Sequence, residues 1–464
     1  MRQAFRWALA LAAVAALAAA SAQSVTPATT AATTTTAATT ADPFNRATFD
    51  VSGWAAGTRG GGGGRLIKVT TLAEAGPGSL REAVEAEGPR TVVFEVGGVI
   101  DMQGKPLNIR HPFLTIAGQT APRPGITLIK GETNIHTQQV IVQHLMFRPG
   151  EFGRPKKGGA DQDGISTQGA AAQVIVDHCS FSWATDENLS VSGPRFNGDG
   201  PDAWRSNTSH QITYSHNLIY EGLANSVHEK GEHSKGSLIH DNASGILLYA
   251  NLYASNMERN ALFKGGVRAA MVNNLIYNPG GRAVHYNLVA HEWVGHPFQL
   301  GRVTLVGNVY RQGPDTRPAT PLFALGGHGD VELFLQDNLA VDEVGHPVAQ
   351  TGVYSAGTAR ILLAAQPYLP PDIRLRGAAR LEAELPLAVG ARPWARDPID
   401  FKLLSDVAEG RGKIIDSELD NAHGYPHGPA YAPTRRPFDA AQWNLVYMSP
   451  KAGWASLFVN GQAH

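Results

Sequence analysis

The amino-acid sequence predicts an all-β solenoid, in which short strands wind into stacked rungs. Short β-branched or apolar runs, punctuated by Gly, Asn and Pro, recur from about residue 65 onward and are typical of strands. Long amphipathic helical stretches are missing between these runs. Asparagines follow several runs at repeated intervals, and self-similarity over roughly 20–50 residues marks repeat architectures. A rung of this kind buries its apolar face only by stacking on its neighbours.

An asparagine column favours the solenoid over a β-sandwich, the alternative for a chain of short strands. Its members follow strand-like runs and precede an apolar residue, with spacings of 34, 23, 34 and 30 residues. They are Asn217, Asn251, Asn274, Asn308 and Asn338. Cys179 and Leu145 occupy the same position in two earlier rungs. Asparagine amides stacked at a turn can hydrogen-bond along the coil, whereas the turns of a sandwich would not repeat this arrangement.

The N-terminal segment, residues 1–22, has the features of a secretory signal peptide. Arg2 and Arg6 supply its positive start, an apolar run of 14 residues follows, and Ala20-Ser21-Ala22 forms a small-x-small cleavage site. The run is shorter than the roughly 20 residues that a membrane-spanning helix needs. We therefore expect an exported protein, secreted or periplasmic, without a membrane anchor.

Three further regions follow this segment. Residues 23–43 are rich in Thr and Ala and can bury little, so we expect a flexible linker. Residues 44–400 form the predicted solenoid, and residues 401–464 are expected to pack on it as a C-terminal extension. Residues 79–82 read Ser-Leu-Arg-Glu, a capping box that predicts a short helix to about Ala86. Such a helix would cap the open N-terminal end of the coil.

Charge and composition bear on the class of function. The chain has 39 basic and 40 acidic residues and a formal net charge of −1, which becomes −3 without Arg2 and Arg6. Because there is no basic surplus to neutralise phosphates, we do not expect nucleic acid as a partner. The single cysteine, Cys179, allows no intrachain disulfide. We expect the folded protein to be a monomer.

Six motifs follow one another along the chain: Gly76–Ala83, Thr115–Pro122, Val176–Trp183, Asn256–Gly266, Gly412–Ser417 and Gly424–Pro426. In this order they resemble the bacterial branch of the pectate lyase family (polysaccharide lyase family 1). The likeness covers roughly residues 57–425. The resemblance implies a right-handed parallel β-helix that cleaves polygalacturonate or a related acidic polysaccharide by β-elimination with the help of Ca²⁺.

Four acidic residues are the candidate metal ligands. Elimination requires neutralisation of the sugar carboxylate, and Ca²⁺ is a hard cation that carboxylates bind. Asp161 and Asp163 lie two apart, so in a strand both would face one side, and Asp186-Glu187 follow on the next rung. The resemblance puts Asp161, Asp163 and Asp186 at or near the calcium-binding acids of the family. Ser190 stands where a further family acid is expected, which puts the number of calcium ions in doubt.

Four basic residues are the candidate catalytic groups. The resemblance makes Arg259 the catalytic arginine, which in the family is assigned as the proton-abstracting base. Because arginine has a pKa above 12, Arg259 could instead pair with the substrate carboxylate. Lys264 is a second cation, where the family more usually has arginine, and Lys235 is our choice for a lysine that contacts substrate. His228 titrates near neutral pH, as does His233, and would be a more natural base.

Two other functions remain open at this stage. The four acids could serve a glycoside hydrolase on the same fold, because hydrolysis uses a pair of carboxyl groups. The serine at 190 and the lysine at 264 keep a non-catalytic carbohydrate-binding β-helix open as well. Trp183 and Trp204 border an insertion and could stack on sugar rings or pack in the core.

Overall fold

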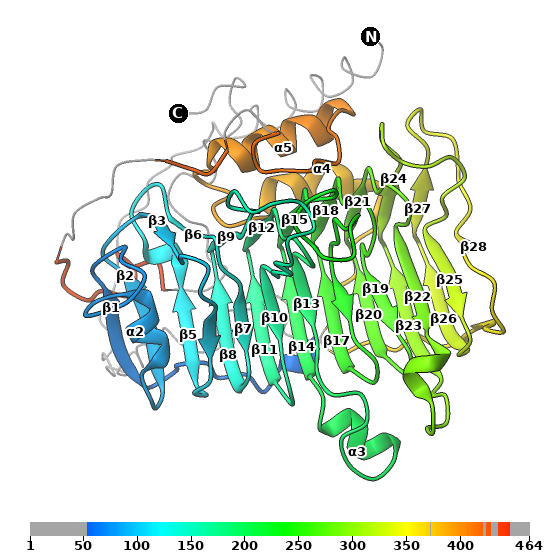
Figure 1. Cartoon of the computed structure of the whole chain (residues 1–464), viewed down its shortest axis with the longest axis horizontal. Coiled ribbons are helices and arrows are strands. Elements are labelled where there is room, and N and C mark those ends of the chain that lie inside the picture. The colour runs from blue at the N-terminus through cyan, green and yellow to red at the C-terminus, as the bar shows by residue number, and fades with distance from the viewer. Residues whose placement is uncertain (1–52, 372, 421–423, 428–434, 446–464) are drawn as a thin grey trace, which may run out of the picture. The chain divides into compact units, whose positions relative to one another are not determined.

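The computed structural model describes residues 53–445 apart from 372, 421–423 and 428–434. The predicted signal peptide (1–22) and linker (23–43) lie outside the described residues. The described strands form three sheets of 11, 9 and 9 strands in which all pairing between successive rungs is parallel (Figure 1). Each full rung contributes one strand to each sheet in turn, so the chain is a right-handed parallel β-helix. The predicted solenoid is confirmed.

Sheet 1 has the longest strands. They are β1 (Arg65–Val69), β2 (Arg90–Phe94), β5 (Leu114–Ala117), β8 (Gln138–Gln143), β11 (Ala172–Asp177), β14 (His210–Ser215), β17 (Ser244–Tyr249), β20 (Arg268–Val272), β23 (Gly301–Val306), β26 (Val331–Gln336) and β29 (Ile361–Leu363). Sheet 2 consists of β4 (Leu107–Ile109), β7 (Thr133–Ile135), β10 (Ile165–Thr167), β13 (Leu189–Val191), β16 (Leu238–Ile239), β19 (Leu262–Lys264), β22 (Val284–Leu288), β25 (Phe323–Gly327) and β28 (Thr351–Val353).

Sheet 3 completes each rung between sheets 1 and 2. Its strands are β3 (Gly98–Asp101), β6 (Ile126–Ile129), β9 (Met146–Arg148), β12 (Ser180–Ser182), β15 (Leu218–Tyr220), β18 (Leu252–Ala254), β21 (Leu275–Tyr277), β24 (Val309–Arg311) and β27 (Leu339–Val341). The helices are η2 (Gly53–Ala55), α2 (Leu80–Glu85), η3 (Gly118–Thr120), α3 (Pro201–Ser206), η4 (Ala290–Trp293), α4 (Ala378–Ala388) and α5 (Pro398–Glu409).

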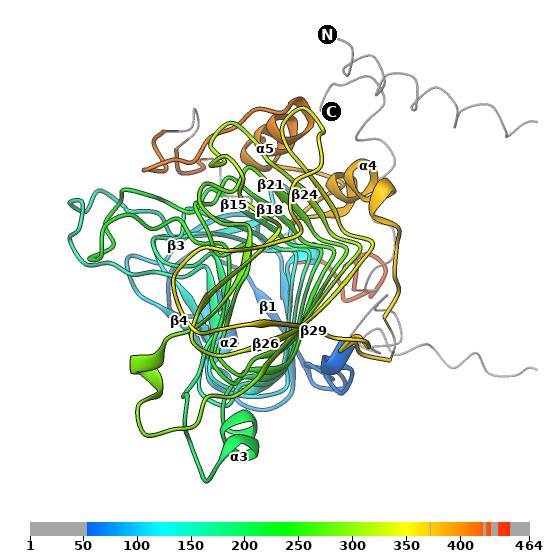
Figure 2. The same ribbon diagram turned by 90° about the vertical axis from the view of Figure 1, so that its right-hand side faces the viewer.

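Alternate side chains of each strand point into the coil and build its core. In sheet 1, Val174 pairs in register with Val140 on one side and Ile212 on the other, and all three are buried in one cluster. Figure 2 looks along the coil and shows the rungs superposed. Because every rung repeats this register, burial continues from one end of the stack to the other.

The predicted asparagine ladder is present at the turn between sheets 1 and 3. The Oδ1 atom of Asn251 accepts from both the backbone N–H and the side-chain amide of Asn217, each at 3.0 Å. Asn274 accepts in the same way from Asn251, at 2.9 and 3.0 Å. At the start of the column, the backbone N–H of Cys179 donates to Asn217 at 2.9 Å. From Cys179 to Asn338 the ladder satisfies buried polar groups at the turns and so fixes the register of these rungs.

Helix α2 closes the N-terminal end of the coil, as the capping box predicts. The Ser79 hydroxyl accepts from the backbone N–H of Glu82 at 3.2 Å. The Glu82 carboxylate accepts from the backbone N–H of Gly78, at 2.6 Å. Leu80 and Val84 are buried in the same cluster as the first strands, so the helix covers apolar side chains that the first rung would otherwise expose.

Helices α4 and α5 lie outside the coil against sheet 3 (Figure 1). Leu381 of α4 and Leu403 of α5 are buried in one cluster with Leu218 and Leu252 of sheet 3. Helix α5 spans the predicted boundary at residue 400. The limits of 44–400 and 401–464 stay predictions. No helix among the described residues is long and apolar enough to cross a membrane.

Glu221 is a buried acid at the end of β15, next to α5. Burial raises the pKa of its carboxyl from 4.5 to about 7, although Lys402 of α5 opposes the shift. The folded state therefore binds more protons than the unfolded state between about pH 4.5 and 7. The stability gained from this protonation is lost as the pH rises through about 7.

We therefore expect Glu221→Gln to raise the melting temperature at pH 8 by roughly 2 °C or more and to change it little at pH 5. The substitution removes a buried charge at the higher pH, whereas at pH 5 the acid is already neutral. Scanning calorimetry at both values measures the difference. Glu343→Gln, at an exposed position, is the matched control and should have no effect. Equal shifts of the Glu221→Gln protein at both pH values would contradict the prediction.

Candidate active site

The candidate residues come together on the loops that lead from sheet 3 into sheet 2. Asp163 precedes β10, Glu187 precedes β13, Lys235 precedes β16 and Arg259 precedes β19. Parallel bridges pair Glu187 with Lys235 and Lys235 with Glu258. Residues that are 23 to 48 positions apart in the sequence are thus neighbours on successive rungs. Stacking of the rungs builds the site.

Three carboxylates converge at its centre. Oxygen atoms of Asp163, Asp186 and Glu187 lie within 4.8 Å of one another. The backbone N–H of Glu187 donates to Asp163 at 2.9 Å. Burial, together with the charges of Asp186 and Glu132, raises the pKa of Asp163 well above its ordinary value. The structure therefore concentrates negative charge that a cation would stabilise.

Asp161 lies beside this cluster but outside it. The strand β10 begins only at Ile165, so the expectation that Asp161 and Asp163 face one side of a strand is wrong. Both acids lie in the loop before the strand, and the Asp161 carboxylate is 3.4 Å from His228 Nε2. Ser190 lies on β13, buried, and its hydroxyl accepts from the backbone N–H of Leu238 at 3.3 Å.

Arg259 faces the acidic cluster directly. Its guanidinium forms an ion pair with Glu187, and its side chain is 23% exposed. Burial lowers the pKa of Arg259, whereas the charges of Asp186 and Asp163 oppose the shift. Arg259 can therefore donate to a substrate carboxylate or, with further loss of solvent, approach the neutral form.

Lys235 forms a second basic position one rung away. Burial, with the charge of Arg282, lowers the pKa of Lys235 to about 8. Its ammonium nevertheless contacts Glu258, which also pairs with Arg282. The contact with an acid opposes the effect of burial. A lysine of this kind can carry its proton or release it close to neutral pH.

His228 and His233 stack face to face, with ring centroids 3.6 Å apart. His233 Nε2 is 2.7 Å from Asp186, a distance that fits a hydrogen bond to the carboxylate. That contact and the charge of His233 hold the pKa of Asp186 below its ordinary value, although burial opposes them. Burial and the neighbouring His233 lower the pKa of His228. Both imidazoles therefore belong to the surroundings of the acidic cluster.

Lys264 belongs to a different set of contacts. It forms an ion pair with Glu292, and its ammonium lies 3.6 Å from Asp241. Arg195 binds the same two acids, at 3.1 and 2.9 Å. Lys264 sits at the far end of β19 from Arg259 and is already neutralised by these neighbours. The structure does not place Lys264 in contact with Glu187 or Arg259.

Sequence reasoning missed three residues of this site. Glu258 links Lys235 to Arg282, and Arg282 lies 23 positions after Arg259, which is one rung. His285, on β22, is buried, and burial together with the charges of Arg282 and Arg259 holds its pKa well below the ordinary value. The rung spacing was a signal that could have identified Arg282.

Trp183 and Trp204 are buried, so they pack within the protein and do not form an exposed surface on which sugar rings could stack.

The chain is similar to curated fungal proteins. It is 30% identical over 375 residues to the probable pectate lyase C of Neosartorya fischeri, a match that covers 79% of each chain. It is 34% identical over 286 residues to the probable pectate lyase C of Emericella nidulans, covering 61% of this chain and 57% of that protein. The Aspergillus terreus protein of the same name matches at 34% identity over 291 residues, 62% of this chain and 59% of its own length. The chain thus spans less than two thirds of these last two relatives.

Solved structures agree on the fold. The thermostable pectate lyase PL 47 superposes with a TM-score of 0.51 at 13% identity, covering 73% of this chain and 96% of that one. Jun a 1, the major allergen from cedar pollen, superposes with a TM-score of 0.50 at 15% identity, covering 73% of this chain and 92% of that one. No family model matches the sequence. The extended similarity to the Neosartorya protein nevertheless shows that the chain belongs to the pectate lyase family.

Proposed function

We propose that this protein cleaves polygalacturonate, or a related uronic-acid polymer, by calcium-assisted β-elimination. The observation that carries the proposal is the convergence of Asp163, Asp186 and Glu187 beside Arg259, in a chain that belongs to the pectate lyase family. A cluster of acids can bind a metal cation, and the adjacent basic side chains can bind the sugar carboxylate. We further propose that the enzyme works as a monomer outside the cytoplasm, secreted or periplasmic.

The residues present fit a hard divalent cation. The three carboxylates supply oxygen ligands within 4.8 Å of one another, and Asp161 lies close by. The raised pKa of Asp163 reflects burial and repulsion between acids that a bound cation would relieve. In this proposal Asp161, Asp163, Asp186 and Glu187 hold the ion. When bound, Ca²⁺ would neutralise the substrate carboxylate and so acidify the neighbouring C–H group.

The protein's own groups would then handle the proton and the substrate. Elimination removes the proton from the carbon beside the carboxylate, forms a carbon–carbon double bond and expels the glycosidic oxygen. Arg259 would either accept that proton in its neutral form or hold the substrate carboxylate in a bidentate pair. Lys235, with a pKa of about 8, would bind substrate as a cation or take part in proton transfer. His228 remains a candidate base, and Lys264 an additional substrate contact.

The geometry favours a lyase over a hydrolase. Glycoside hydrolysis uses two carboxyl groups about 5–5.5 Å or 6.5–9.5 Å apart on either side of the bond. Here three acids crowd together within 4.8 Å, and one of them pairs with Arg259. Three acids this close together suit the binding of one cation better than the acid–base chemistry of a hydrolase. The following assay distinguishes an enzyme from a non-catalytic carbohydrate-binding β-helix.

We expect the purified protein, mixed with polygalacturonate and Ca²⁺, to produce a growing near-ultraviolet absorbance from the unsaturated product. A chelator should abolish the signal, because the carboxylate cluster would lose its cation. New reducing ends without absorbance would identify a hydrolase instead. Neither signal across a panel of uronate polymers, with binding retained, would refute the enzymatic proposal in favour of a binding protein.

A further inference from the structure

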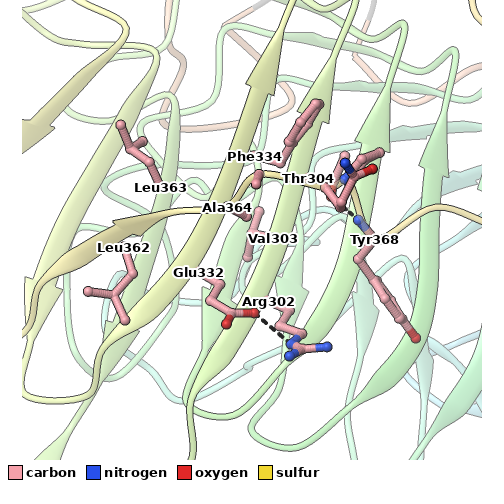
Figure 3. Close-up of a pocket in the computed structure, with 12 residues that line it drawn as sticks. Arg302, Val303, Thr304, Glu332, Phe334, Leu362, Leu363, Ala364 and Tyr368 are labelled. Atoms are coloured by element: carbon pink, nitrogen blue, oxygen red, sulfur yellow. Dashed lines mark hydrogen bonds and ion pairs between the residues drawn. The ribbon is translucent and has the colours of Figure 1, made fainter.

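A pocket of about 460 Å³ lies on the outer face of sheet 1 (Figure 3). The candidate active site lies elsewhere, on the loops leading into sheet 2. Its floor consists of outward-facing side chains of β23 and β26, among them Arg302, Thr304 and Glu332. Residues 362–368 form its wall. The volume is in the range that accommodates small ligands.

The wall is held in place by a specific contact. The backbone N–H of Tyr368 donates to the hydroxyl of Thr304 at 2.8 Å. The Tyr368 ring stacks on Trp54 of η2, with centroids 4.5 Å apart and an interplanar angle of 20°. Trp54 and Tyr368 are both only partly buried. The pocket therefore has an anchored aromatic side, of the kind that packs against the C–H face of a sugar ring.

Two arginines lie on the same face of sheet 1 as the pocket. Arg268 and Arg302 pair directly in register on neighbouring rungs, so their side chains leave the same face of sheet 1, about 4.8 Å apart at the backbone. Arg302 Nε lies 2.7 Å from Glu332. No ion pair to Arg268 is found among the described residues. Arg302 lines the pocket, whereas Arg268 lies one rung away, outside the lining. Burial raises the pKa of the Tyr368 hydroxyl, and the charges of both arginines oppose that shift.

This combination defines a class of ligand. Guanidinium groups bind carboxylates in bidentate fashion. Glu332 can accept hydrogen bonds from sugar hydroxyls, and its charge makes the pocket a poor site for a dense polyanion such as nucleic acid. Two arginines spaced by one rung suit a chain that carries single, separated carboxylates.

We propose that the pocket is a second binding site for an acidic oligosaccharide, in which Arg268 and Arg302 bind uronate carboxylates and Tyr368 packs on a sugar ring. The class of ligand rests on the proposed function, whereas the site itself rests on the pocket, on Arg302 in its lining and on Arg268 in register beside Arg302. Such a site would hold the polymer on one face of the coil while another segment of it occupies the active site. It would increase the effective concentration of substrate.

The test uses tetragalacturonate and the Arg259→Ala protein, so that the ligand is not consumed. Binding is measured by titration calorimetry in the presence of a chelator. The chelator weakens the binding that depends on calcium, so the binding that remains is assigned to the second site. We expect residual binding, and we expect Arg268→Ala/Arg302→Ala in the same background to weaken it at least ten-fold. Arg360→Ala is the matched control, because Arg360 is an exposed arginine that pairs with Asp330 at 2.6 Å outside the pocket lining. It should leave binding unchanged.

Several results would overturn the proposal. No residual binding in the parent protein, equal affinity in the double variant, or equal affinity for a neutral galactose tetramer would each do so. If the double variant melts at a lower temperature than its parent, the single Arg302→Gln variant, with its half-exposed side chain, replaces it. Cleavage of polygalacturonate by the chain with Arg259 intact is measured separately. Cleavage without pocket binding refutes only this inference, whereas pocket binding without cleavage refutes only the proposed function.

Discussion

Replacing Arg259 with alanine should lower kcat on polygalacturonate by roughly 10³-fold or more. Arg259 is the cation nearest the acidic cluster, paired with Glu187 and 23% exposed. Its removal takes away either the acceptor of the proton or the cation that holds the substrate carboxylate, and either loss raises the barrier to elimination. The measurement is the initial rate of near-ultraviolet absorbance at saturating substrate and Ca²⁺.

Two controls make this result specific. Arg259→Lys retains a cation but loses the bidentate fork, so activity should recover only in part if pairing with a carboxylate is the role. Arg360→Ala removes an exposed arginine that pairs with Asp330 and should leave kcat unchanged. Loss of Arg259 also leaves Glu187 without its ion pair, so melting temperatures must accompany the rates. Full activity in a folded Arg259→Ala protein would refute the assignment of this residue.

Replacing Asp163 with asparagine should weaken Ca²⁺ binding by roughly 10²-fold or more. Asp163 is a partly buried member of the cluster, and its oxygen lies within 4.8 Å of those of Asp186 and Glu187. The substitution removes one charge and retains the shape of the side chain. Calorimetric titration with CaCl₂ measures the affinity without reference to turnover.

The same variant has a second, opposite expected effect. Burial and neighbouring acids raise the pKa of Asp163, so its negative charge is unfavourable in the protein without a cation. In a chelator, Asp163→Asn should therefore melt at a higher temperature than the parent, and added Ca²⁺ should stabilise it less. Asp161→Asn, at the edge of the cluster, is the control and should give smaller changes in both measurements. A variant that binds Ca²⁺ as tightly as its parent would contradict the site.

The fold could be predicted because its information is local and repeated. Strand-like runs, the position of Asn217 and its counterparts, and the Ser79–Glu82 capping box each report on nearby backbone. The structure confirms all three through hydrogen bonds such as Asn217 to Asn251, at 3.0 Å. An error of a few residues in the predicted strand bounds of one rung does not change the prediction for the next rung, because each rung repeats the same pattern.

The candidate site could be predicted only in part. Asp163, Asp186, Glu187 and Arg259 were identified from their residue types together with the resemblance of the surrounding motifs to the pectate lyase family, and the structure brings them together. The expectation of a strand at Asp161 and Asp163 was wrong because the side chains of a loop do not alternate. Glu258 and its contacts could not be foreseen, because ion pairs between rungs depend on the lengths of the intervening loops.

The sequence by itself determined the coil, its ladder and the supply of acids and cations for one site. Only the tertiary structure decided which of these charges meet. Lys235 joins Glu258, whereas Lys264 joins Glu292 and Asp241 at the other end of its strand. Register between rungs also aligns Arg268 with Arg302 on sheet 1, away from the loops that carry the candidate active site. Periodicity along a chain fixes what each rung contains, whereas loop length and stacking fix which side chains become neighbours.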